Sequence, residues 1–136
     1  MEQNRKKNSG FEDFDRKESI SFGHYLEESD RLLFADSYYD GEAGRRRSEI
    51  VLLDRKSGGR KRISAGGEGE GNPALSPDGR QVLFLSTLPG QGRQLFVYDL
   101  ETEACRRVTT MRFGLTDPLW SPDGTKILFT SSGSDL

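Results

Sequence analysis

Short apolar runs, separated by glycine, proline and charged residues, follow one another along most of the chain. The runs at 82–85 (VLFL) and 95–98 (LFVY) are four residues long and rich in aliphatic and aromatic residues, which predicts strands rather than helices. Both runs are apolar at every position, so we expect each strand to be covered on both faces. The pattern therefore predicts an all-β protein whose sheets stack on one another.

An internal repeat organises these runs. Residues 72–87 (NPALSPDGRQVLFLST) and 117–132 (DPLWSPDGTKILFTSS) lie 45 positions apart, and half of their sixteen aligned positions are identical. A third, diverged copy lies upstream, where residues 50–54 (IVLLD) match 95–99 (LFVYD) at the same spacing. This first copy lacks the shared turn and carries five extra residues between its second and third strands, within 36–48. Self-similarity of this period is typical of repeat architectures.

The turn within the repeat has the residue types of a type I turn. Proline presets φ at its second position, aspartate accepts local backbone hydrogen bonds, and glycine ends it. The two copies, which we treat as a structural turn motif, are Ser76, Pro77, Asp78 and Gly79, and Ser121, Pro122, Asp123 and Gly124. Four strands in each 40–45 residues is the period of a β-propeller blade. A β-sandwich of seven or more strands also has frequent turns, but it does not require self-similarity.

We therefore predict a partial β-propeller of about two and a half four-stranded antiparallel blades. Its expected parts are a flexible polar tail (1–17) and a propeller fragment (18–136). Within the fragment we expect a degenerate blade 1 (18–66), a blade 2 (72–110) and a truncated blade 3 (117–136). Propellers close with roughly four to eight blades, so the remaining blades or other copies are needed for closure.

Composition narrows the range of partners. Charged residues make up 31% of the chain but nearly cancel, with 20 Lys and Arg against 22 Asp and Glu, so we expect neither nucleic acid nor membrane as a partner. There is no apolar segment after Met1 of the kind found in secretory signals, and a single cysteine, Cys105, excludes an internal disulfide. These features predict a cytoplasmic location.

Few residues suggest chemistry, and each has a simpler interpretation. His24 is the only candidate imidazole base, but it lacks a recognisable nucleophile partner. Glu27 and Glu28 could hold an ammonium group, yet they stand in a degenerate turn and are expected to be solvated. Cys105 is expected to be a small packing residue, and Trp120 to pack between blades.

The glycine-rich and basic segments invite ligand-binding interpretations. Residues 66–71 (GGEGEG) resemble a phosphate loop only in their glycines, because two glutamates and then a strand follow, and we expect a flexible joint between blades. Arg45, Arg46 and Arg47 could contact an anionic partner, but three charges at a hairpin tip are more often solvated. One carboxylate per turn, at Asp78 and Asp123, does not make a calcium site. We predict no catalytic, cofactor-binding or metal-binding residues.

The two turns and their settings, 73–79 (PALSPDG) and 118–124 (PLWSPDG), resemble the WD40-like repeats of TolB-type propellers. They also resemble the N-terminal propellers of prolyl oligopeptidase-family serine peptidases. The order of the chain is most similar to the start of acylaminoacyl-peptidase-like enzymes, with an acidic-aromatic segment (11–14) before a blade with a long charged hairpin. The first copy departs from the pattern because it lacks the turn motif.

This resemblance implies a segment of a substrate-gating propeller that stands over a separate hydrolase domain. The chain has no G-x-S-x-G nucleophile elbow and no helices alternating with strands, so the segment itself is expected not to be an enzyme. The alternative is a TolB-like propeller that acts as a protein- or peptide-binding scaffold. In both cases the expected partner is a protein or peptide.

Overall fold

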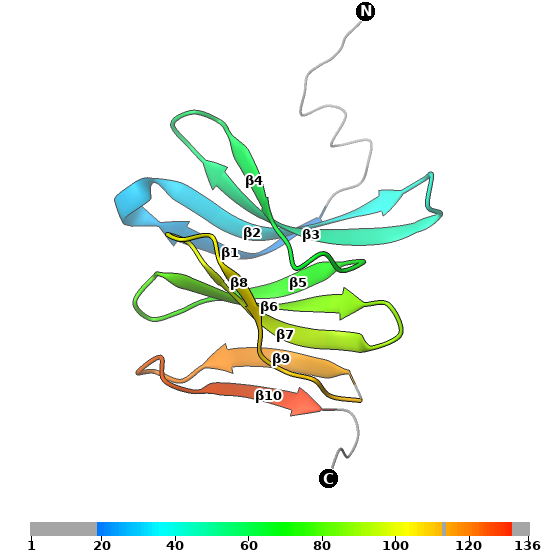
Figure 1. The fold of residues 1–136 in the computed structure, drawn as a ribbon. Coiled ribbons are helices and arrows are strands. Elements are labelled where there is room, and N and C mark those ends of the chain that lie inside the picture. The colour runs from blue at the N-terminus through cyan, green and yellow to red at the C-terminus, as the bar shows by residue number, and fades with distance from the viewer. Residues whose placement is uncertain (1–18, 113, 132–136) are drawn as a thin grey trace, which may run out of the picture.

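A computed structural model describes residues 19–112 and 114–131, and shows three antiparallel sheets stacked in chain order (Figure 1). The first sheet has the order β1-β2-β3-β4, the second β5-β6-β7-β8, and the third pairs β9 with β10. This arrangement confirms the all-β, partial-propeller prediction. The predicted tail (1–17) lies outside the described residues. No helix in the described part of the chain is long and apolar enough to cross a membrane.

The first sheet contains the long hairpin that the extra residues produce. Its elements are β1 (Ser19–Leu26), the 3₁₀ turn η1 (Glu27–Ser29), β2 (Arg31–Asp40), β3 (Arg45–Asp54) and β4 (Arg60–Ile63). Strands β2 and β3 pair without interruption from the Arg31–Asp54 pair to the Asp40–Arg45 pair. The extra residues therefore lengthen both strands to ten residues, instead of forming a loop.

The second and third sheets follow the 45-residue repeat. Their strands are β5 (Glu70–Leu75), β6 (Gln81–Leu88), β7 (Gly92–Asp99), β8 (Cys105–Arg107), β9 (Leu115–Trp120) and β10 (Ile127–Ser131). Strand β5 contacts β1, β2 and β3, and β9 contacts β5, β6 and β7, so each new sheet packs its first strand against the sheet before it. Both first strands begin two residues earlier than the blade boundaries expected from the repeat.

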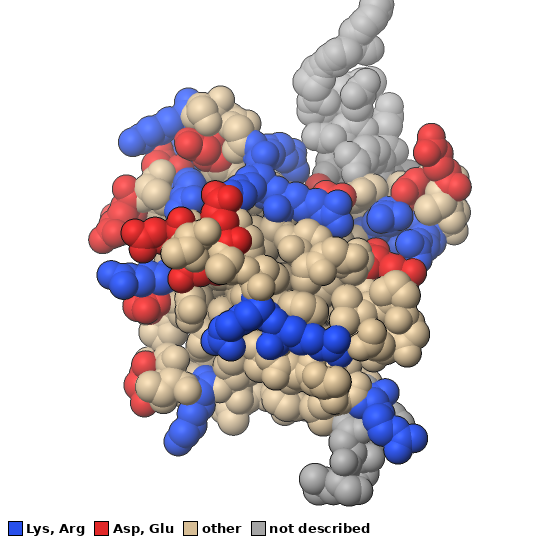
Figure 2. Space-filling view, viewed as in Figure 1, with Lys and Arg blue, Asp and Glu red and all other residues tan. Residues whose placement is uncertain are grey.

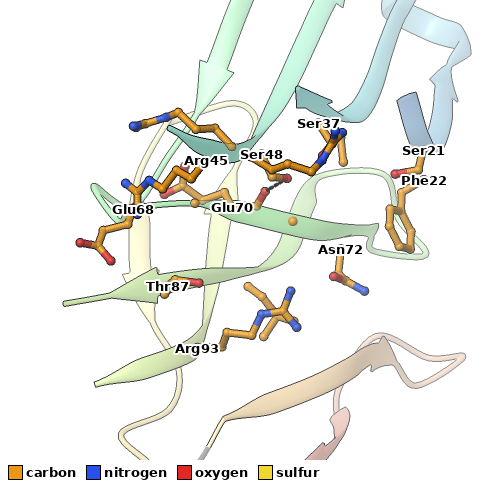
Figure 3. Close-up of a pocket in the computed structure, with 16 residues that line it drawn as sticks. Ser21, Phe22, Ser37, Arg45, Ser48, Glu68, Glu70, Asn72, Thr87 and Arg93 are labelled. Carbon is orange, nitrogen blue, oxygen red and sulfur yellow. Dashed lines mark hydrogen bonds between the residues drawn. The ribbon is translucent and has the colours of Figure 1, made fainter. Parts of the chain in front are cut away.

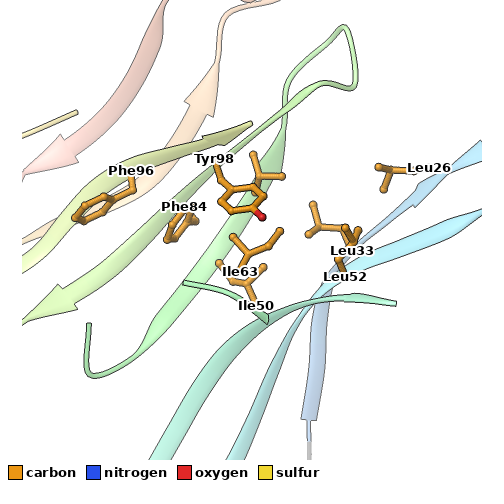
Figure 4. Close-up of a cluster of buried hydrophobic side chains, with 9 residues drawn as sticks. Leu26, Leu33, Ile50, Leu52, Ile63, Phe84, Phe96 and Tyr98 are labelled. Atoms are coloured by element: carbon orange, nitrogen blue, oxygen red, sulfur yellow. The ribbon is translucent and has the colours of Figure 1, made fainter. Parts of the chain in front are cut away.

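Successive residues of β6 and β7 alternate between two cores. Val82, Phe84, Phe96 and Tyr98 pack against the first sheet, in a cluster with residues such as Leu33, Ile50, Leu52 and Ile63 (Figure 4). The intervening residues Leu83, Leu85, Leu95 and Val97 pack against Leu115 on the other side. The expected cover on both faces is therefore confirmed. Each buried side chain of this size contributes roughly 1.5–3 kcal/mol, and these clusters hold the stack together.

Polar side chains reinforce the seam between the second and third sheets. The Trp120 indole Nε1–H donates to the carbonyl oxygen of Ala74 at 2.9 Å, and the ring packs against the second core cluster. Gln94 is fully buried; its amide nitrogen donates to the Met111 carbonyl at 2.8 Å, and its amide oxygen accepts from the Thr109 hydroxyl at 2.7 Å. Trp120 thus packs between blades, as the sequence predicts.

The outward face of the third sheet carries apolar residues at positions that are covered in the second sheet. Leu119 and Leu128 are 58% and 59% exposed, and they correspond by the 45-residue offset to Ala74 and Leu83 of the second sheet. In the second sheet these positions belong to the cluster that the third sheet covers. The outward face of β9 and β10 therefore has the apolar character of a face that is covered in the second sheet.

Candidate functional site

A groove of about 460 Å³ opens where the first two sheets meet (Figure 3). Its walls come from β1, from the ends of β2 and β3 nearest their hairpin, from the segment that leads into β5, and from β6 and β7 near their own hairpin. Arg45 and Ser37 lie on the first-sheet side of the groove in Figure 3, and Arg93 and Thr87 lie on the second-sheet side. All these parts belong to the same rim of the stack, where both long hairpins turn.

Four arginines line the groove. Arg45, Arg46 and Arg47 are the first three residues of β3, and Arg93 is the second residue of β7. The hairpin tip is formed by residues 41–44, so the three arginines do not occupy the tip, which corrects the sequence-based placement. Arg45 and Arg46 are nevertheless exposed, as expected for solvated charges, and Arg47 is half-buried, so lining the groove does not remove them from solvent. On the face seen in Figure 2, acidic and basic side chains are interspersed over the upper sheet, and a row of basic side chains crosses the otherwise uncharged middle.

The floor of the groove is fixed by a buried carboxylate, Glu70, which is only 1% exposed. Its Oε2 accepts four hydrogen bonds of 2.9–3.2 Å, from Ser64 Oγ, Ala65 N, Gly67 N and Ser86 Oγ. Its Oε1 lies 3.4 Å from a guanidinium nitrogen of Arg62. In addition, the Ser48 hydroxyl donates to the Glu70 carbonyl at 2.5 Å (Figure 3).

These bonds correct the expectation of a flexible joint at 66–71. The segment is pinned to both sheets, because the donors to Glu70 come from the joint itself, from β4 and from β6. Gly67 lies so close to the neighbouring strand that an added Cβ would stand 2.6 Å from the Thr87 carbonyl oxygen and closer still to the Ser86 hydroxyl. The glycine is therefore required for close approach rather than for flexibility.

A β-bulge recurs in the first strand of each sheet. Pairing with the second strand shifts register at Phe22 in β1, at Asn72 in β5 and at Asp117 in β9, and all three residues have φ between 54° and 58°. Asparagine and aspartate tolerate this left-handed conformation, whereas a bulky residue is strained there. Phe22 is thus the exception, and its ring is 49% exposed at the end of the groove opposite Glu68 (Figure 3).

The turn motif lies on the opposite rim, because β5 starts at the groove and ends at Leu75, next to the turn. In the first copy Gly79 N donates to the Ser76 carbonyl at 2.8 Å, and the Ser76 hydroxyl donates to Asp78 at 2.6 Å. The second copy repeats the same bonds at 2.9 Å and 2.7 Å. Pro77 and Pro122 occupy the second position of each turn.

Hydroxyl groups in these turns also lower the pKa values of the turn aspartates. The Ser121 hydroxyl, with the backbone N–H and the hydroxyl of Thr125, lowers the pKa of Asp123 to about 2. The pKa of Asp78 is lowered by the same kind of contact from Ser76. The carboxylate oxygens of both aspartates accept the hydrogen bonds that close the turns. Each turn ends at a glycine, Gly79 or Gly124, in the left-handed region with φ of 75°.

The other candidates do not assemble into a catalytic site. The Nε2 of His24 donates to the Pro73 carbonyl at 3.3 Å and so joins β1 to β5. Glu27 and Glu28 are exposed in η1, as expected. Cys105 is exposed rather than packed, and the desolvation that remains raises the pKa of its thiol. Among residues 19–112 and 114–131 there is no group of three or more His, Cys, Asp or Glu that could hold a metal ion.

Glu70 and Phe22 are the residues that sequence reasoning missed. Glu70 could have been noticed because its position in the next repeat is Leu115, which is fully buried. Phe22 could have been found only from the bulge register, since the first copy lacks the turn motif that aligns the other two. For Glu70 the signal was a mismatch between copies at equivalent positions, whereas no such signal for Phe22 is present in the sequence alone.

Comparison with known proteins identifies the repeat. The TolB beta propeller domain matches residues 37–135. The uncharacterized peptidase YuxL of Bacillus subtilis (strain 168) is 32% identical over 98 residues, which cover 72% of this chain. These residues cover only 15% of YuxL, so the chain spans a small part of this relative.

Solved structures share the fold. The acylaminoacyl peptidase of Pyrococcus horikoshii superposes with a TM-score of 0.65 at 22% identity, over 85% of this chain and 17% of that one. The β-propeller domain of the Trilobed protease from Pyrococcus furiosus gives 0.64 at 20% identity, over 82% and 33%. TolB from Acinetobacter baumannii gives 0.61 at 22% identity, over 88% and 28%. With the family model matching most of its length, the chain belongs to the TolB β-propeller domain family.

Proposed function

We propose that the chain is a non-catalytic segment of the N-terminal, substrate-gating propeller of a prolyl oligopeptidase-family serine peptidase. The observation that carries this proposal is its similarity to YuxL, a protein named as a peptidase, of which the chain covers only 15%. The structural likeness to an acylaminoacyl peptidase adds support, since it too involves a small share of a longer chain. The catalytic groups would then belong to another part of the protein.

The chemistry of the described residues supports a role without catalysis. The imidazole of His24 is engaged with a backbone carbonyl, so it is not positioned as a base for a nucleophile. The raised pKa of the Cys105 thiol keeps it protonated at neutral pH, and the thiolate is the reactive form. His24 instead joins β1 to β5 through this hydrogen bond.

A gate requires a wall that does not open by itself. The first two sheets are joined by an apolar cluster and by the bonds to Glu70, and the second and third by another cluster and by the hydrogen bond from Trp120 to Ala74. Such seams keep neighbouring blades together, so that access is restricted to the openings that a complete propeller offers. Short peptides would then pass more readily than long or folded ones.

The presence of a hydrolase domain can be tested on the native protein. Antibodies raised against this chain would recover the protein from its source, and a fluorophosphonate probe would label an active serine. We expect a labelled polypeptide much larger than the 15.3 kDa of this chain. A recovered protein that takes no label, and whose peptides map only to propeller repeats, would instead support a TolB-like protein- or peptide-binding scaffold.

Gating can be tested separately in the same native-length protein. Glu70→Leu removes the acceptor that ties the first two sheets together, and should raise the rate of cleavage of a peptide of about thirty residues relative to one of about five. Arg106→Gln, an exposed substitution on the outer strand β8, is the matched control. An unchanged ratio in the Glu70 variant would contradict a gating role for this seam.

A further inference from the structure

Two exposed arginines line the groove, Arg45 on its first-sheet side and Arg93 on its second-sheet side. Neither Arg45 nor Arg93 forms an ion pair or a hydrogen bond through its side chain within the described part of the chain. Their neighbours are partly engaged: Arg46 donates to the Ser37 hydroxyl at 3.2 Å, and Arg47 lies 3.7 Å from Asp40. Both guanidinium groups are therefore available to bind an anion at the groove.

The acidic residues of the groove compensate this positive charge only in part. The carboxylate of Glu70 is buried and accepts hydrogen bonds from the joint and from β6. Glu68 is exposed and lies at the outer end of the groove in Figure 3. A ligand with a single negative charge fits this setting, whereas a polyanion would also face Glu68.

Phe22 supplies an apolar surface at the other end of the groove. It holds a left-handed backbone conformation with φ of 58°, at a bulge where the other two sheets use Asn72 and Asp117. Its ring belongs to neither core cluster. An exposed aromatic ring in a strained conformation that core packing does not explain points to a role in binding.

We propose that this groove binds the carboxyl-terminal end of an extended peptide. The carboxylate would lie between Arg45 and Arg93, since guanidinium groups bind carboxylates through paired, charge-assisted hydrogen bonds. An apolar side chain at the end of the peptide would rest on Phe22. The volume of about 460 Å³ lies in the range of small-ligand sites and accommodates a chain end rather than a folded domain.

The choice of a peptide as ligand rests on the proposed function. Because binding is measured without hydrolysis, the binding proposal and the proposed function can fail separately. The probes are acetyl-Ala-Ala-Phe with a free carboxyl group, its carboxyl-terminal amide, and acetyl-Ala-Asp-Phe-amide, titrated calorimetrically into the full chain at low salt. We expect the free acid to bind at least tenfold more tightly than either amide. Equal binding of the first two peptides, or of the acid and the aspartyl amide, would overturn the assignment to a terminal carboxylate. So would tighter binding of adenosine monophosphate, or of inorganic phosphate, than of the free acid.

Matched variants assign the binding to these residues. Arg45→Gln and Arg93→Gln should each weaken the binding of the free acid about tenfold, which is the loss of one charge-assisted hydrogen bond. Arg106→Gln, on the exposed strand β8, should leave it unchanged. Equal weakening by all three substitutions would show a general charge effect and would overturn the proposal.

Phe22→Asn separates binding from folding. Asparagine is the residue that the second sheet has at the same bulge, so the variant should unfold at the same urea concentration as the parent or a higher one. The same variant should bind the free acid several-fold more weakly. An unchanged affinity, or a clearly lower unfolding midpoint, would show that Phe22 serves the fold and not a ligand.

Discussion

Replacing the buried Glu70 by leucine tests whether this carboxylate holds the first two sheets together. Leucine is the relevant substitution because Leu115 occupies the same place in the next repeat and is fully buried. The change would leave the backbone N–H groups of Ala65 and Gly67 without an acceptor, whereas the Ser64 and Ser86 hydroxyls can rotate to other partners.

The balance of two effects gives the size of the change. Each of the two unsatisfied, half-buried donors costs about 1–3 kcal/mol, and the buried leucine returns about 1.5–3 kcal/mol of apolar transfer free energy. We therefore expect the free energy of unfolding of Glu70→Leu to fall by about 2 kcal/mol. With a denaturant dependence of about 1–3 kcal/mol per molar urea, the midpoint would fall by about 1–2 M.

Urea unfolding of the full chain measures the total loss of stability, and amide hydrogen exchange shows which residues lose protection. The amides of Ala65 and Gly67 should lose protection in Glu70→Leu, while those of β7 keep theirs. Glu70→Gln, which retains one amide oxygen as acceptor, should cost less than the leucine variant. Replacing buried charged groups by apolar ones is neutral or stabilising in some proteins. A leucine variant as stable as the parent would place Glu70 in that class and would refute the reasoning.

Further substitutions test the contacts between sheets and the turns. Gly67→Ala should lower the free energy of unfolding by about 2 kcal/mol because its Cβ has no room. In Gly69→Ala, where the nearest atom is 4.0 Å away, urea unfolding should show less than half that loss. Trp120→Phe should cost about 1 kcal/mol in the same assay through the lost indole hydrogen bond, and no change would contradict a role for that bond. The lowered pKa values of Asp78 and Asp123 mean that their stabilising contribution is present above pH 4 and lost as pH falls toward 2. Asp123→Asn should accordingly lose less stability than the parent between pH 4 and pH 2.

The stacked sheets could be predicted from the sequence because the repeat and its apolar runs are local features. The alternation of β6 and β7 between two cores follows from runs such as 82–85, in which no position is polar. The turn geometry follows from Ser-Pro-Asp-Gly alone, since each of its bonds joins residues close in the chain. Such features need no knowledge of which segments meet in space.

The groove could not be predicted in the same way, because its parts come from distant segments. Glutamate is rarely buried, and the partners that make Glu70 an exception lie in β4, in the joint and in β6. Arg45 and Arg93 are 48 residues apart in sequence and share a cavity only because the two sheets stack in register. A run of arginines read along the chain therefore suggested a solvated hairpin.

The two rims of the stack differ in the residues that they carry. One rim carries the turn motif, whose side chains close the turns and recur unchanged in the second and third copies, whereas the first copy has the 3₁₀ turn η1 there. The other rim carries the positions at which the copies disagree: phenylalanine where asparagine and aspartate stand at the bulge, and a carboxylate where leucine stands in the next first strand. A repeat needs only its shared residues to build the scaffold, so costly departures that converge on one groove require another cause. Binding at that groove supplies such a cause, and Phe22→Asn is the substitution that separates it from folding.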